Sequence, residues 1–138
     1  MPTSPDQRFE RASTFASLEE IVEGAQRYAE RVFADEDVAY AFVLAVSEAV
    51  TNAIEHGNAA DPEKHVVAEF RAGEERVEAR VTDQGDGFDP TVVDDPLEDA
   101  HLTRTHGRGL HIIHRAADAV HYEADGRRVR MVFSRDDA

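Results

Sequence analysis

The chain has 138 residues, of which 41% are hydrophobic, and its formal net charge is −14 at pH 7. This length and composition predict one globular domain with its own core, and the acidic charge argues against direct contact with nucleic acid or an anionic membrane. The lack of cysteine excludes disulfides and thiolate metal sites. The sequence shows neither a signal peptide nor an uninterrupted apolar run of about 18 residues, so we expect no membrane span and a cytoplasmic location.

The apolar patterns predict an edge strand, two helices, two strands, a long loop, a third helix and two final strands. The expected ranges, in chain order, are 8–14, 17–33, 35–57, 65–71, 76–82, 85–106, 108–118, 119–124 and 128–133. Strands that follow one another in pairs favour antiparallel pairing. The predicted fold class is therefore α+β, a two-layer sandwich with a mostly antiparallel mixed sheet and helices on one face.

Several residues mark the expected ends of these elements. Residues 1–7 are polar and contain two prolines, so we expect a disordered tail and a single domain over 8–138. Ser17 and Glu20 have the spacing of a capping box for the first helix. Gly57 is a typical helix stop, and the last hairpin is expected to turn at Asp125-Gly126.

The second helix carries an unusual polar strip. The stretch Val38 to Val46 has no charged residue, which predicts a mostly buried helix. Glu48, Asn52 and Glu55 then fall within an arc of roughly 60° on a helical wheel. Polar groups on a buried helix need partners, so this strip either reaches water or lines a pocket.

A glycine motif follows the second of the paired strands, in the sequence TDQGDGF. Asp83 ends the strand, and Gly85 and Gly87 follow at alternate positions. Two interpretations fit this motif by itself. It is an ordinary turn, or Asp83 accepts a hydrogen bond from a ligand amine while the glycines make room for a planar ring.

A second glycine motif, THGRGLHII, is predicted to begin the third helix. Gly107 and Gly109 would place backbone N–H groups at a helix N-terminus, where anions bind, although a flexible helix entry explains the pair equally. The spacing is not that of a P-loop, and no parallel βαβ unit surrounds it as in a Rossmann fold.

Taken in this order, the three motifs resemble those of the GHKL ATPase superfamily, which includes histidine kinases, DNA gyrase and mismatch-repair ATPases. The sequence SEAVTNAIEHG, with Glu48 and Asn52, matches the N-box of that superfamily. The two glycine boxes are matched by Asp83, Gly85 and Gly87, and then by Gly107 and Gly109. The resemblance implies a Bergerat-type histidine-kinase-like ATPase domain, in which the loop between the glycine boxes is the ATP lid.

Within the superfamily the chain most resembles the small serine/threonine protein kinases that act as anti-sigma factors, the RsbW-like kinases. This resemblance implies ATP and Mg²⁺ as cofactors. It also implies a homodimer that binds a sigma factor and phosphorylates a serine or threonine of an anti-sigma-factor antagonist. Neither direct nucleic-acid binding nor a membrane is implied.

The resemblance also assigns roles to residues of this chain. Glu48 would be the general base, and Asn52 would offer its oxygen to Mg²⁺. The residues implied to bind the nucleotide are Asn52, Asp83, Gly85, Gly87, Arg104, Gly107, Arg108, Gly109 and Leu110. The chain departs from its relatives at Thr105, where many carry an arginine, and at Arg127 and Arg128, where many have a threonine near the adenine.

Two functions from different classes remain open at this point. Glu48 favours an active kinase that is also an anti-sigma factor. Thr105 leaves room for a nucleotide-dependent partner-switching module that transfers little or no phosphate. A histidine-kinase fragment is disfavoured because 138 residues leave no room for the helix pair that carries the acceptor histidine. The histidines lack a paired carboxylate at fixed spacing, which disfavours structural zinc.

Overall fold

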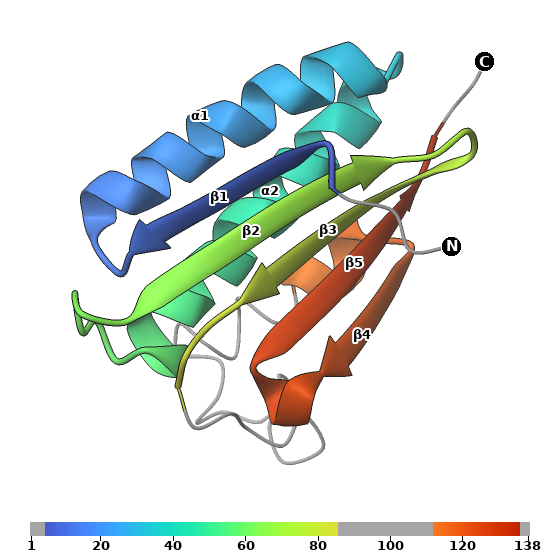
Figure 1. Ribbon diagram of the computed structural model, residues 1–138. Helices are drawn as coiled ribbons and strands as arrows, with labels where there is room; N and C mark the ends of the chain where they lie inside the picture. Colours follow the sequence, from blue (N-terminus) through green and yellow to red (C-terminus); the bar gives the residue numbers. More distant parts are fainter. Residues whose placement is uncertain (1–4, 86–111, 136–138) are drawn as a thin grey trace.

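The computed structural model describes residues 5–85 and 112–135, which form a sheet covered on one face by helices (Figure 1). The five strands lie in the order β1-β2-β3-β5-β4, and each neighbouring pair is antiparallel. The helices and strands are β1 Gln7–Ala12, α1 Phe15–Val32, α2 Glu36–Asn52, β2 His65–Ala72, β3 Arg76–Thr82, a short helix over 112–116, β4 Ala119–Glu123 and β5 Arg128–Ser134. The predicted α+β fold with an antiparallel sheet and helices on one face is confirmed; the described part contains no parallel strand pair.

The first strand begins earlier than expected. β1 begins at Gln7, and Asp6 is already held in place. The Asp6 backbone N–H donates to the Phe70 carbonyl at 2.8 Å, and the Asp6 carboxylate accepts from the Tyr28 hydroxyl and the Ala72 N–H, both at 2.8 Å. These bonds extend the sheet into the segment that composition alone suggested was a disordered tail.

The N-cap predicted for α1 is wrong. The helix begins at Phe15 with Thr14 as N-cap, and the Thr14 side chain accepts from the Ser17 N–H at 3.2 Å. Ser17 lies inside the first turn and is buried, while Glu20, its expected capping-box partner, instead pairs with Arg11 at 3.0 Å. Both Thr14 and Ser17 are good capping residues, and the position of β1 decides between them.

The glycine within α1 has a packing role that the sequence did not reveal. A Cβ on Gly24 would collide with the ring of Phe9 from β1. The Phe9 ring also lies 6.0 Å from the ring of Phe70. The cost of a glycine inside a helix is therefore accepted because it lets the edge strand pack closely against α1.

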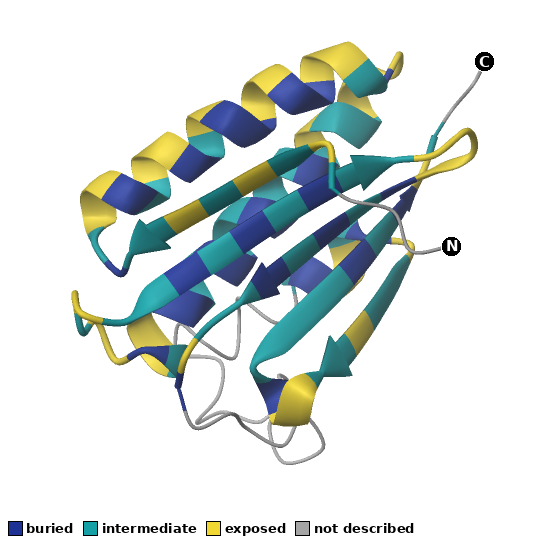
Figure 2. Ribbon diagram, in the orientation of Figure 1, coloured by how far each residue is buried: buried dark blue, intermediate teal, exposed yellow. Residues whose placement is uncertain are grey.

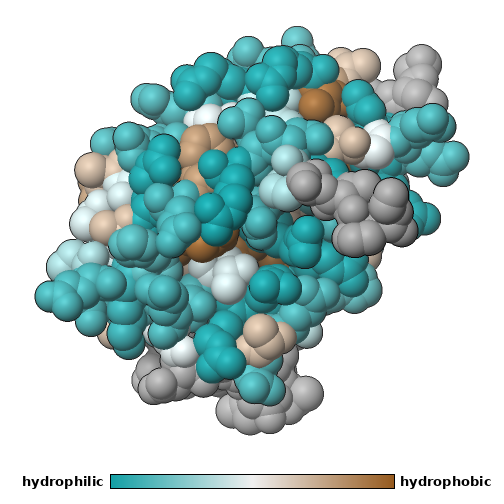
Figure 3. All heavy atoms as spheres, in the orientation of Figure 1, coloured by the Kyte–Doolittle hydropathy of each residue, from teal (hydrophilic) through white to brown (hydrophobic). Residues whose placement is uncertain are grey.

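The core lies between the helices and the sheet, and Phe42 of α2 is at its centre. The Phe42 ring centroid lies 5.1 to 5.9 Å from those of four other aromatic residues: Tyr28, Phe33, Phe70 and Phe133. Buried and partly exposed residues alternate along β2 and β3, so one face of each strand meets the helices (Figure 2). The opposite face is largely hydrophilic (Figure 3).

The segment Glu36–Gly57 is long and apolar enough to cross a membrane by length and composition, although charged residues such as Glu48 interrupt its apolar run. In the fold it is a core helix, because Phe42, Ala45, Val46, Ala49 and Val50 are buried within the domain.

Candidate functional site

The predicted N-box lies at the end of α2, where the helix changes its winding. α2 ends at Asn52 and continues as a π-helical turn over Ala53–Gly57. The expected single helix to Gly57 is thus two segments of different geometry. Short π-helical turns inside α-helices occur frequently at functional sites. This turn carries the chain from the buried helix towards the end of β3.

The polar atoms of the Asn52 side chain are buried and lack a partner among the described residues. Both its Oδ1 and its Nδ2 are shielded from solvent, and neither makes a hydrogen bond with the part of the chain that the structure describes. Leaving a buried polar group unsatisfied costs about 1–3 kcal/mol. An oxygen held free in this way fits a ligand that prefers oxygen, such as Mg²⁺.

Glu48 lies one helical turn before Asn52. Burial raises the pKa of its carboxyl above the usual range, and the nearby Glu55 carboxylate raises it further. Glu55 itself is exposed and lies 4.0 Å from the ring of His56. Of the polar strip predicted on this helix, Glu48 and Asn52 therefore face the interior side, and Glu55 reaches water.

Asp83 follows β3 and is held by the backbone on both sides. Its N–H donates to the Arg127 carbonyl at 2.9 Å, and its Oδ1 accepts from the Gly85 N–H at 2.8 Å. Burial is the main cause that raises the pKa of the Asp83 carboxyl, and the Gly85 N–H, Arg127 and Lys64 offset it in part. The other carboxylate oxygen, Oδ2, lies beside Gly57, next to the position that a Cβ on Gly57 would take.

Two glycines allow the N-box and the first glycine box to meet. A Cβ on Gly57 would collide with the Asp83 carboxylate, and a Cβ on Gly85 would collide with the Gly57 carbonyl. Residues that are separated by nearly thirty positions in the sequence are therefore in contact here, and only glycine permits the approach at both positions. The structure brings Gly57, Asp83 and Gly85 together where the π-helical turn after α2 meets the end of β3. Glu48 and Asn52 lie in the last two turns of α2 that lead to this contact.

Asn58 belongs to this junction but was not singled out from the sequence. It is completely buried, and its side chain bonds to Ser13, to the His65 carbonyl and to the Gln84 N–H. The sequence suggested only a helix stop at this position, because an asparagine after a glycine is common in turns. No periodic pattern indicates that this side chain is buried.

The final hairpin lies against the same end of β3. Arg127 supplies the carbonyl that accepts the Asp83 N–H, which places the region after Gly126 beside Asp83. Arg128 donates from Nε to the Thr82 hydroxyl at 3.1 Å and lies 3.6 Å from Glu123. Arg128 is therefore used in bonds between strands.

The other predicted site residues lie outside the described residues. They are Gly87, Arg104, Gly107, Arg108, Gly109 and Leu110, together with Thr105 and almost all of the expected ATP lid. His114, on the short helix over 112–116, is described, and its Nε2 lies 3.0 Å from the Tyr122 hydroxyl.

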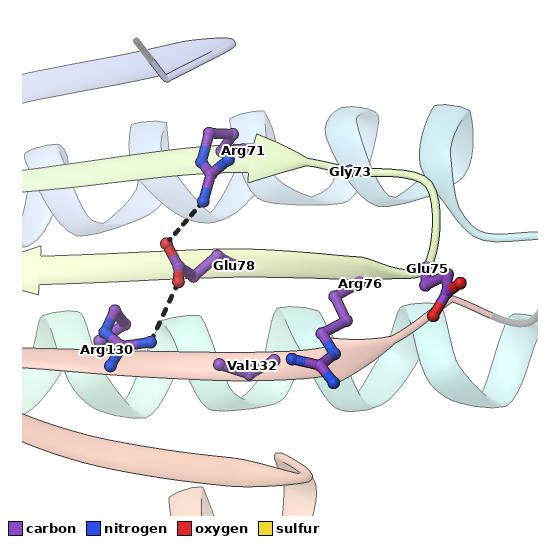
Figure 4. A pocket seen from close by; sticks show the side chains of 7 residues that line it. All are labelled: Arg71, Gly73, Glu75, Arg76, Glu78, Arg130 and Val132. Atoms are coloured by element: carbon purple, nitrogen blue, oxygen red, sulfur yellow. Dashed lines mark hydrogen bonds and ion pairs between the residues drawn. The ribbon is translucent and has the colours of Figure 1, made fainter. Parts of the chain in front are cut away.

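A separate pocket lies on the outer face of the sheet, at the opposite end of β3 from Asp83 (Figure 4). Its volume is about 350 Å³, and it contains none of the predicted site residues; it is lined by Arg71, Gly73, Glu75, Arg76, Glu78, Arg130 and Val132. Glu78 lies between Arg71 at 3.5 Å and Arg130 at 3.1 Å. Glu78 is thus paired with two arginines, although Arg71 Nε, like the Asn52 amide, has no hydrogen-bond partner among the described residues.

Comparisons with known proteins agree with this arrangement. Residues 12–133 match the family described as the histidine kinase-like ATPase domain. The chain is 32% identical over 83 residues to the serine-protein kinase RsbW of Listeria innocua, covering 56% of this chain and 53% of that protein. It is 36% identical over 91 residues to the serine-protein kinase RsbW of Bacillus licheniformis, covering 59% and 55%. The chain thus spans about half the length of these curated relatives.

A solved structure shows the same fold. The crystal structure of the RsbU and RsbW domains of Rv1364c from Mycobacterium tuberculosis superposes with a TM-score of 0.61 at 21% sequence identity, covering 97% of this chain and 32% of that one. At 21% identity this similarity shows a shared fold and nothing more. The family match spans most of the chain, including the segments of the N-box and both glycine boxes, and the chain therefore belongs to the histidine kinase-like ATPase domain family.

Proposed function

We propose that this protein is an ATP-dependent serine/threonine protein kinase that phosphorylates an anti-sigma-factor antagonist and also binds the corresponding sigma factor. The observation that carries the proposal is the buried Asn52 side chain, which lacks a partner among the described residues and lies one turn from Glu48. The name serine-protein kinase, printed for the Listeria and Bacillus relatives, supports the reaction class.

The adenine end of the proposed site rests on Asp83. Its carboxylate would accept from the adenine amine, and Gly57 and Gly85 permit the close packing that holds the carboxylate beside the end of the helix. Guanine presents a carbonyl at that position and would be rejected. One unmade hydrogen bond to a charged group costs about 1.5–3 kcal/mol, so ATP should bind about tenfold more tightly than GTP, or more.

The phosphate end rests on Asn52 and Glu48. Asn52 would hold Mg²⁺ through Oδ1, and the bound cation would neutralise phosphate charge. Glu48 would accept the hydroxyl proton of the antagonist serine or threonine as its oxygen bonds to the γ-phosphorus and ADP leaves. Burial raises the Glu48 pKa, which makes this carboxylate a stronger base than an exposed one.

The experiment is transfer of labelled phosphate from ATP to the purified antagonist protein encoded nearby, with Mg²⁺ and with Mg²⁺ chelated. We expect phosphoserine or phosphothreonine on the antagonist only when Mg²⁺ is present. ATP binding without transfer to the cognate antagonist would overturn the kinase assignment and favour the partner-switching module. Absence of ATP binding would overturn both.

The proposed partners need a separate measurement. We propose a cytoplasmic homodimer that grips the sigma factor in a nucleotide-dependent way. Light scattering should give a dimer mass, and purified sigma factor should bind with different affinities in the presence of ATP and ADP. A monomer that binds no sigma factor with either nucleotide would remove the anti-sigma role while leaving the ATP site intact.

A further inference from the structure

Asn58 is a buried polar residue at the point where four segments of the chain meet. Its Nδ2 donates to the Ser13 hydroxyl at 2.8 Å and to the His65 carbonyl at 3.0 Å. Its Oδ1 accepts from the Gln84 N–H at 2.7 Å. The side-chain amide thus uses both of its donors and its acceptor, and the residue is 0% exposed.

The bonds around Asn58 form a closed ring with two other residues. Asn58 accepts from the Gln84 backbone and donates to the His65 backbone, and the Gln84 side chain accepts from the His65 N–H. Each of the three residues is therefore bonded to both of the others. A ring of this kind fixes the position of the Gln84 backbone relative to the start of β2 and to the end of the π-helical turn.

Gln84 is the residue between Asp83 and Gly85, and Asn58 follows Gly57 directly. Gly57 faces the Asp83 carboxylate, and Gly85 faces the Gly57 carbonyl. The Asn58–Gln84 hydrogen bond therefore lies beside the contact that joins the N-box to the first glycine box. Loss of this bond would let Asp83 move relative to the end of the helix. Gly57 and Gly85 have no side chains that could keep the two segments at a fixed distance.

The backbone conformation after Asn58 is energetically unfavourable, so the surrounding hydrogen bonds must stabilise it. Ala59 and Ala60 both have positive φ, at 52° and 56°, which residues with a Cβ adopt at a cost. The Asp61 N–H donates to the Asn58 carbonyl at 3.0 Å, and the Ala60 N–H donates to the Ile54 carbonyl at 2.7 Å. Strained backbone that persists beside a site indicates that the surrounding bonds determine its conformation.

We propose that Asn58 is a positioning residue for nucleotide recognition, which sets the place of Asp83 against the end of the N-box helix and thereby the discrimination between adenine and guanine nucleotides. This inference rests on the proposed function of Asp83. It assigns to Asn58 a role beyond stability, because a residue that only stabilised the fold would change the affinities for ATP and GTP equally or not at all.

The test compares Asn58→Ala with Tyr28→Phe, which removes a partly buried hydrogen bond to Asp6 at the other end of β2 from His65. Thermal unfolding followed by circular dichroism identifies a temperature at which the parent and both variants are folded. Calorimetry at that temperature then measures the affinities for Mg-ATP and Mg-GTP. We expect Asn58→Ala to lower ATP affinity about tenfold, to change GTP affinity less, and so to reduce the ATP-to-GTP ratio; Tyr28→Phe should keep the parent ratio.

A second variant keeps the test decisive if Asn58→Ala does not fold. The Gln84 side chain is exposed, so Gln84→Ala should fold while it breaks the bond to the His65 N–H. We expect the ATP-to-GTP ratio to fall in the same direction, by about threefold. An unchanged ratio in every folded variant, with a parent that prefers ATP, overturns this inference alone. A parent that binds neither nucleotide overturns the proposed function and this inference together.

Discussion

Two groups of carboxylates in this protein lie in opposite surroundings. Glu48 and Asp83, at the end of the sheet where α2 meets β3, have their pKa values raised mainly by burial. Glu123, on the outer face, has its pKa lowered, first by its hydrogen bond to Arg130 at 2.9 Å. Glu78 on the same face is bonded to Arg130 and lies near Arg71 (Figure 4).

The difference separates polar groups that stabilise the fold through ion pairs from polar groups that a ligand would satisfy. On the outer face Glu78 and Glu123 are each paired with an arginine on a neighbouring strand. At the inner end the acids are partly desolvated and the Asn52 amide lacks a partner among the described residues. Groups held in this state lower stability, and they occur where a ligand is bound.

The largest expected effect that separates the two groups concerns Glu48. Glu48→Gln keeps size and helix propensity, so the helix and ATP binding should persist while phosphoryl transfer falls by roughly 10²–10⁴-fold. Transfer of labelled phosphate to the antagonist measures the rate, and Glu78→Gln on the outer face is the matched control. Transfer by Glu48→Gln at the parent rate would show that Glu48 is not the base.

The next effect concerns the metal oxygen of Asn52. In Asn52→Ala, Mg²⁺-dependent ATP binding should weaken by roughly tenfold, because the proposed oxygen ligand is gone. Calorimetry with and without Mg²⁺ separates this loss from a general weakening. Stability should change little or rise, because the buried polar group that is removed has no partner among residues 5–85 and 112–135. Equal Mg²⁺ dependence in parent and variant would contradict the assignment.

A smaller effect tests the sign of the Asp83 pKa shift. A raised folded-state pKa means that ionised Asp83 destabilises the fold, and that this cost develops as pH rises from the ordinary value of 3.8 through the folded pKa. Asp83→Asn should therefore raise the free energy of unfolding at pH 7 by up to about 1 kcal/mol, and the gain should vanish near pH 3. Denaturant unfolding at both pH values measures it, and a loss of stability at pH 7 would contradict burial as the dominant cause.

The smallest effect is the opposite one on the outer face. The lowered Glu123 pKa stabilises the fold above the ordinary value of 4.5, and this contribution is lost as pH falls through the folded pKa. Because the side chain is 34% exposed, Glu123→Gln should lower stability at pH 7 by only about 0.5–1 kcal/mol. The same unfolding experiment, repeated in high salt, should reduce the difference. If Glu123→Gln were more stable than the parent at pH 7, ionised Glu123 would not stabilise the fold, and the contrast with Asp83 would be lost.

Much of the fold could be predicted from local patterns. The strands expected at 65–71 and 76–82 are found at His65–Ala72 and Arg76–Thr82, because alternation of apolar residues reports directly on which face is buried. The N-cap of α1, in contrast, could not be predicted from local patterns. Thr14 and Ser17 are equivalent by residue type, and the course of the chain out of β1 selects Thr14.

The residues of the candidate site were also predictable only in part. Glu48, Asn52, Asp83 and Gly85 stand out because their residue types and spacing form a recognisable order of motifs along the chain. Asn58 could not be found, because its role depends on Ser13, His65 and Gln84, which are distant in sequence. A hydrogen-bond partner that is far along the chain leaves no periodic signal.

The sequence by itself determined the order of elements, the burial of α2 and the family of this protein, because these follow from local periodicity and from short motifs. The tertiary structure decided that Gly57 faces Asp83, that the Asn52 amide is left without a partner among the described residues, and that the outer-face acids are neutralised by arginines. The physical reason is that burial and pairing depend on which segments pack together, and a residue's type alone does not specify its neighbours.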